Sequence, residues 1–89
     1  MSSEIVSATV AINQPEGWHA RPATEFARIV GESGLTVTIG RPGQPPMRGD
    51  SVLSLLTLGA KFEEELVIEV SGGSAEDQKA LLHALIGLF

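Results

Sequence analysis

The spacing of the apolar residues changes along the chain from that of a strand to that of a helix. In residues 4–12 apolar side chains recur at every second position, which is typical of a strand with one buried face. That face carries Val6, Ala8, Val10 and Ile12. Beyond residue 20 they recur at intervals of three and four, the spacing of one helix face. Those positions are Ala23, Phe26, Ala27 and Val30.

The remaining segments continue to alternate between strand and helix patterns. Further strands are predicted at residues 35–39, 47–49 and 66–70. The helix that begins at Ala20 should end at the glycines of residues 31–34, and a short helix should follow a cap at Ser51 and stop before Gly59. A last helix should begin after Ser74. Its apolar stripe is Leu81, Leu85 and Leu88.

The order of these elements is β-α-β-β-α-β-α, which predicts an α+β fold of two layers. We expect a four-stranded antiparallel sheet covered on one face by three helices. Because 89 residues can bury little more than one core under one sheet, residues 1–89 are expected to form a single domain.

Composition excludes several classes of function. The chain has no cysteine, which rules out disulfides and thiolate metal sites. Its basic residues are scattered and its formal net charge is -5, so we expect no nucleic-acid partner. There is no basic segment followed by an apolar run and no apolar stretch of about 18 residues, so we expect a cytoplasmic protein without membrane insertion.

Neither His19 nor His83 is accompanied by further ligands at metal-binding spacing, so no metal site is predicted. We interpret His83 as an ordinary residue of the last helix. We also expect a monomer without a cofactor.

The octapeptide GWHARPAT at residues 17–24 contains the candidate site. Pro22 has no N–H group and is tolerated only in the first turn of a helix, so it places His19 at or just before the helix N-terminus. The free backbone N–H groups of that turn, in the region of Ala20, Arg21 and Pro22, then face the imidazole. Together with the Arg21 guanidinium they can bind a phosphoryl group carried by the ring.

Histidine suits the role of a nucleophile because a neutral imidazole has a free ring nitrogen for attack. The chain has no Gly-x-x-x-x-Gly-Lys phosphate loop, and only Glu16 and Glu25 lie near His19 in sequence. It therefore has no nucleotide site of its own and no obvious general base. The phosphoryl donor is expected to be another protein, which makes this chain a carrier with a phosphohistidine intermediate rather than a stand-alone enzyme.

The octapeptide closely resembles the active-site signature of the HPr family, the histidine-containing phosphocarriers of the bacterial phosphoenolpyruvate:sugar phosphotransferase system. A second segment, DSVLSLLTLG at residues 50–59, resembles the family's signature around its regulatory serine and short helix. The predicted element order is also that of the family. Two signatures at this separation and in this topology make the resemblance specific over nearly the whole chain.

The resemblance implies a phosphoryl relay. His19 would accept the phosphoryl group on Nδ1 from phosphorylated enzyme I and pass it to a histidine of an enzyme IIA domain, while Arg21 stabilises the phosphate. The short helix would present apolar side chains to both partners. The implied partner surface is Trp18, Thr24, Val52, Leu53 and Leu56.

Two positions depart from the family pattern. Trp18 stands where leucine is usual, and its ring could widen the partner surface or cover the sheet edge. Ser51 corresponds to the regulatory serine but follows Asp50 rather than a basic residue, and that negative charge opposes a second phosphate. Ser51 is therefore a candidate regulatory residue whose main expected role is the helix cap.

Two kinds of alternative function remain open at this stage. The same histidine chemistry could serve a nitrogen-regulatory relay, a dihydroxyacetone kinase system or a multidomain phosphoryl-transfer protein. A different class is a regulatory module that keeps the fold and docks on partners without carrying phosphate. The presence of both His19 and Arg21 argues against this second class.

Overall fold

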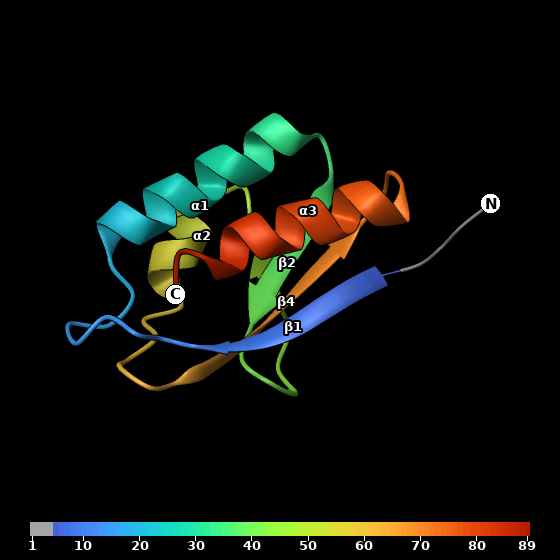
Figure 1. Cartoon of the computed structure of the whole chain (residues 1–89). Helices are drawn as coiled ribbons and strands as arrows, with labels where there is room; N and C mark the ends of the chain where they lie inside the picture. The colour runs from blue at the N-terminus through green and yellow to red at the C-terminus, as the bar shows by residue number, and fades with distance from the viewer. Residues whose placement is uncertain (1–4) are drawn as a thin grey trace.

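The computed structural model describes residues 5–89 and confirms the predicted fold class (Figure 1). Its elements follow one another in the predicted order: β1 (Ile5–Ala11), α1 (Ala20–Ser33), β2 (Thr36–Gly40), β3 (Met47–Arg48), α2 (Val52–Thr57), β4 (Glu65–Ser71) and α3 (Ala75–Ile86). Within the described residues, the strand ends differ from the predicted ones by at most one residue. Residue 4, where the first strand was predicted to begin, lies outside the described residues.

Within residues 5–89 the four strands form one antiparallel sheet in the order β1-β4-β2-β3. The inner strand β4 pairs with β1 at Ala8↔Ile68 and with β2 at Ile39↔Ile68. Side chains two positions apart share a face of a strand, so Leu66, Ile68 and Val70 point the same way, and all three are fully buried. Figure 1 shows α1, α2 and α3 on this same side of the sheet.

The helices bury the faces that the spacing of their apolar residues predicted. Phe26 and Val30 of α1 and Leu81 and Leu85 of α3 belong to the core, and burial of such a side chain stabilises the fold by about 1.5–3 kcal/mol. Leu88 lies beyond the end of α3 and is half-buried. None of the helices within residues 5–89 has the length and apolar character needed to cross a bilayer.

Trp18 lies in the core rather than on the surface. It is 6% exposed, and its ring stacks on Phe89 with 4.9 Å between centroids and meets the edge of Phe26 at 5.9 Å. Both geometries are favourable for aromatic pairs. The prediction that Trp18 belongs to a partner surface is therefore wrong, because the indole fills the core instead.

The loop that precedes β4 is anchored by an ion pair. Arg41, which follows β2, donates through Nε and Nη2 to the two carboxylate oxygens of Glu64, and the Lys61 N–H donates to the same carboxylate at 3.0 Å. The hydrogen bond from Arg41 lowers the pKa of Glu64, because it stabilises the ionised carboxylate. The segment from residue 60 to 64 is thereby held in place beside the loop that carries His19.

Candidate functional site

The loop before α1 is held by backbone hydrogen bonds on both sides of Gly17. The Gly17 N–H donates to the Gln14 carbonyl at 2.8 Å, and the Trp18 N–H donates to the Ala60 carbonyl at 2.8 Å. Gly17 has φ of +83°, and a Cβ at this position would lie 2.8 Å from the Ala60 oxygen. Only glycine fits here, and the loop delivers the next residues to the helix in a defined position.

His19 is the N-cap residue of α1, as the sequence predicted. Its backbone is extended, its carbonyl accepts from the Ala23 N–H at 3.1 Å, and its side chain makes no capping hydrogen bond. Pro22 is the third helical residue and has no N–H to satisfy. Among the described residues the N–H groups of Ala20 and Arg21 have no acceptor. This end of the helix therefore offers two free donors.

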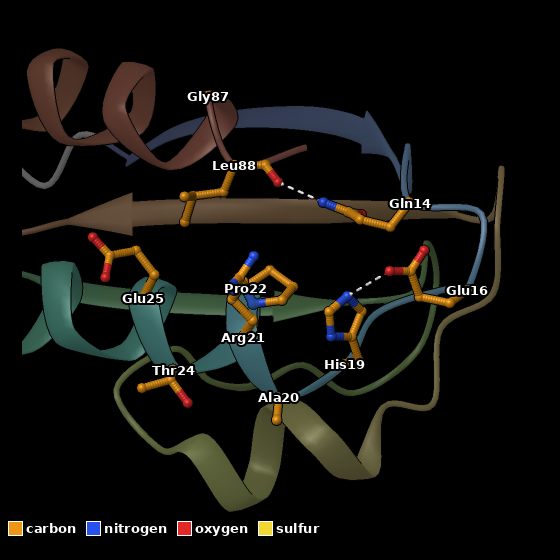
Figure 2. Close-up of a pocket in the computed structure, with 10 residues that line it drawn as sticks. All are labelled: Gln14, Glu16, His19, Ala20, Arg21, Pro22, Thr24, Glu25, Gly87 and Leu88. Carbon is orange, nitrogen blue, oxygen red and sulfur yellow. Dashed lines mark hydrogen bonds and ion pairs between the residues drawn. The ribbon is translucent and has the colours of Figure 1, made fainter.

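A hollow of about 890 Å³ lies in front of this helix end (Figure 2). It is lined by the first turn of α1, by Gln14 and Glu16 from the loop, and by Gly87 and Leu88 from the C-terminal segment. Gln14 joins the loop to that segment, since its Nε2 donates to the Leu88 carbonyl at 2.8 Å across 74 positions of sequence. His19, Arg21 and the other octapeptide residues Ala20, Pro22 and Thr24 all line the hollow. The sequence held no signal for Gly87 and Leu88.

The imidazole of His19 is accessible from the hollow. Its side chain is 38% exposed, and its Nε2 lies 3.1 Å from a carboxylate oxygen of Glu16. Figure 2 shows the other ring nitrogen, Nδ1, on the side of the ring that faces the first turn of α1. In the sequence, Glu16 is recognisable only as an acid near His19. The turn at Gly17, which folds the loop back, is the sequence signal that could have placed it beside the ring.

Arg21 is the one arginine without an ion pair, and all four arginines of the chain lie in the described part. The other three pair with carboxylates: Arg28 with Glu25 and Glu32, Arg41 with Glu64, and Arg48 with Asp50. The guanidinium donors of Arg21 are thus available to an anion in the hollow. Within residues 5–89 no three His, Cys, Asp or Glu side chains are grouped so that they could hold a metal ion.

Ser51 caps α2, as predicted, because its Oγ accepts from the Ser54 N–H at 3.2 Å. The neighbouring Asp50 accepts two hydrogen bonds from Arg48, at 3.0 and 2.8 Å. These bonds lower the pKa of Asp50, because they stabilise the ionised carboxylate next to Ser51. A phosphate on Ser51 would meet this charge and would also displace the cap.

α2 packs against α1 and exposes part of its apolar surface. Leu55 is fully buried, whereas Leu53 is 75% and Leu56 39% exposed. Val52 is half-buried against the core, and Thr24 of α1 is exposed. Apart from Trp18, the residues of the predicted partner surface are therefore accessible, and their contact with partners stays a prediction.

Fold and site together define a class of protein: a small open-faced α+β sandwich with an accessible histidine at the N-terminus of a helix, where backbone donors favour an anion. A family model described as "PTS HPr component phosphorylation site" matches residues 6–89. The chain belongs to this family, the HPr and NPr phosphocarriers of the phosphotransferase system. The predicted family is confirmed.

Individual relatives agree with this assignment. The chain is 38% identical over 79 residues to phosphocarrier protein HPr of Streptomyces coelicolor, which covers 89% of this chain and 82% of the relative. It is 35% identical over 80 residues to phosphocarrier protein NPr of Proteus mirabilis, which covers 90% and 86%. Its fold is similar to that of HPr from Bacillus anthracis str. Ames, with a TM-score of 0.81, 21% identity and coverage of 94% and 95%.

Proposed function

We propose that this chain is a cytoplasmic phosphocarrier of the phosphoenolpyruvate-dependent sugar phosphotransferase system. In this proposal His19 takes a phosphoryl group from phosphorylated enzyme I and passes it to a histidine of an enzyme IIA domain. The observation that carries the proposal is the convergence of three groups on one hollow: an accessible imidazole, two unpaired amides and the one arginine without an ion pair.

The transfer step needs little beyond positioning and charge. The lone pair of Nδ1 attacks the phosphorus, and the bond from phosphorus to the donor breaks with its electron pair returning to the donor. Because such transfers pass through a loose transition state, positioning and stabilisation of the oxygens supply most of the catalysis. The N–H groups of Ala20 and Arg21 and the Arg21 guanidinium are the groups proposed to do this. Each interaction with a helix end is worth about 0.3–1 kcal/mol, which is weak enough to let the phosphoryl group leave again.

The proposed docking surface is Val52, Leu53 and Leu56 of α2 together with Thr24 of α1. A single exposed apolar residue is common on protein surfaces, but two exposed leucines on a helix of six residues form a patch that water solvates poorly. The patch lies on the helix that packs against α1, which carries the hollow. Ser51 enters the proposal as a helix cap and not as a second phosphorylation site.

The direct test of the proposal is to mix the chain with enzyme I and phosphoenolpyruvate labelled in its phosphate. We expect stoichiometric, acid-labile label on the chain and its passage to an added enzyme IIA domain. The measurement is gel autoradiography before and after acid treatment. If no enzyme I tested transfers label to the wild-type chain, the proposal is wrong and the docking module without phosphate becomes the better interpretation.

Replacing Leu53 by aspartate should weaken docking without touching the chemistry. Leu53 is 75% exposed and outside the hollow, so the fold and His19 should be unaffected. A central apolar contact of an interface is worth about 2 kcal/mol, so we expect KM for the chain as a substrate of enzyme I to rise about thirtyfold at constant kcat.

The matched control for this variant is Ile5→Asp, which changes a residue that is 59% exposed at the start of β1, away from α2. Its KM should equal that of the wild type. Equal KM values for Leu53→Asp and Ile5→Asp would show that α2 is not part of the docking surface.

A second candidate circuit has support from the relatives. The chain is 38% identical to an HPr and 35% identical to an NPr, so sequence identity hardly separates the two groups of phosphocarriers. The histidine chemistry is common to both, and only the proteins on either side differ. The two circuits can be distinguished by adding a panel of acceptor domains to the phosphorylated chain, because the cognate acceptor should take up the labelled phosphoryl group fastest.

A further inference from the structure

The contact between Glu16 and His19 has a chemical consequence for the ring. An Oε atom of Glu16 lies 3.1 Å from Nε2 of His19, and both side chains are partly open to solvent, with exposures of 61% and 38%. Figure 2 shows the carboxylate on the Nε2 side and the first turn of α1 on the Nδ1 side of the ring. The two ring nitrogens therefore have different electrostatic surroundings.

A neutral imidazole carries one N–H and one lone pair. A carboxylate oxygen at this distance attracts an N–H on Nε2 and repels a lone pair there, so the tautomer with the proton on Nε2 is favoured. The lone pair is then on Nδ1, on the side of the ring where the first turn of α1 lies. The Ala20 and Arg21 N–H groups of that turn have no acceptor among the described residues. Glu16 thus favours the tautomer whose nucleophilic nitrogen points at the anion site.

The same carboxylate also stabilises the positive charge that the ring acquires during transfer. When Nδ1 gives its lone pair to phosphorus, the ring keeps its Nε2–H and becomes cationic, and no proton has to leave. When the N–P bond breaks in the next transfer, the electron pair returns to Nδ1 and the ring is neutral again. A carboxylate beside Nε2 stabilises the cationic form.

The repulsion between Glu16 and the phosphoryl oxygens does not cancel this attraction. The carboxylate lies against Nε2, whereas the phosphoryl group would be bonded to Nδ1, on the side of the ring where the first turn of α1 lies. Coulomb energy falls with distance, and solvent screens the longer separation more. The other carboxylate at the hollow, Glu25, is already paired with Arg28 at 2.5 Å.

We propose that Glu16 is a positioning residue for His19. Its carboxylate favours the tautomer with a free Nδ1 and stabilises the phosphorylated, cationic ring. This inference rests on the proposed function and goes beyond it by assigning a role to a residue outside the octapeptide. Because both groups are partly exposed, the expected effect is modest, about two- to fivefold, and should shrink as salt is raised.

The first arm of the test needs no phosphoryl transfer. In unphosphorylated, ¹⁵N-labelled protein, NMR correlations between the ring nitrogens and ring protons give the shares of the two neutral tautomers. We expect the share with the proton on Nδ1 to rise about two- to fivefold in Glu16→Ala. The control Glu69→Gln, on the opposite face of the sheet, should match the wild type. An unchanged tautomer share in Glu16→Ala overturns the inference.

The second arm measures the equilibrium of label between enzyme I and the chain. Glu16→Gln keeps the shape and a polar oxygen but loses the charge, so the equilibrium should shift about two- to fivefold toward phosphorylated enzyme I at low salt and less at high salt. An equilibrium equal to that of the wild type overturns the inference. If instead the proposed function is wrong, the wild type itself will take up no label, and this result is distinct from an unchanged equilibrium in Glu16→Gln.

Discussion

We expect His19→Ala to take up no phosphoryl group from phosphorylated enzyme I, while His83→Ala takes up as much as the wild type. The chain has two histidines, and of these only His19 lines the hollow, at the N-terminus of α1. Alanine offers no nucleophile, so the loss should be complete rather than partial. The measurement is acid-labile label, with phosphorus NMR of the wild type to identify the nitrogen that carries it.

The fold should survive this change, because the structural role of His19 lies in its backbone. Its carbonyl accepts from the Ala23 N–H, and its side chain caps nothing. Circular dichroism spectra of His19→Ala and wild type should therefore coincide. Acid-labile label that persists in His19→Ala would place the phosphorylation site elsewhere.

The second large effect concerns stability. Trp18→Ala should lower the free energy of unfolding by about 3–5 kcal/mol, the usual range for removal of a buried aromatic side chain. The ring is 6% exposed and contacts both Phe26 and Phe89, so its loss leaves a cavity between α1 and the C-terminal segment. The measurement is urea unfolding followed by far-UV circular dichroism, because the variant lacks the only tryptophan of the chain.

Two controls separate packing from other effects of this change. Trp18→Phe should be less destabilising than Trp18→Ala, because it keeps an aromatic ring. It also loses no hydrogen bond, because the indole N–H of Trp18 has no partner among the described residues. Phe62→Ala removes an aromatic side chain that is 47% exposed and should change stability far less. A loss below about 1 kcal/mol for Trp18→Ala would show that the cluster is loosely packed.

The fold could be predicted from sequence because its signals are local. Buried residues recur with a period of two in a strand and of 3.6 along one face of a helix. The buried faces of β1 and α1 could therefore be predicted from the spacing of their apolar residues. The place of His19 could be predicted for the same reason. Pro22 restricts the backbone within one helical turn, and that restriction does not depend on the rest of the molecule.

The surroundings of His19 were harder to predict because they come from distant segments. Leu88 and Gln14 meet at the hollow across 74 positions of sequence. Likewise, only the packing of α2 on α1 decides that Leu55 is buried and Leu53 is not.

The order of strands and helices, the faces they bury and the start of α1 at His19 follow from the sequence, since each depends on interactions within a few residues. The inward turn of Trp18 onto Phe89, the contact of Glu16 with the imidazole and the lack of a carboxylate partner for Arg21 became clear only in the folded molecule. These contacts depend on how folded elements and loops are placed relative to one another. That placement is set by the packing of the whole core and not by any local pattern of residues.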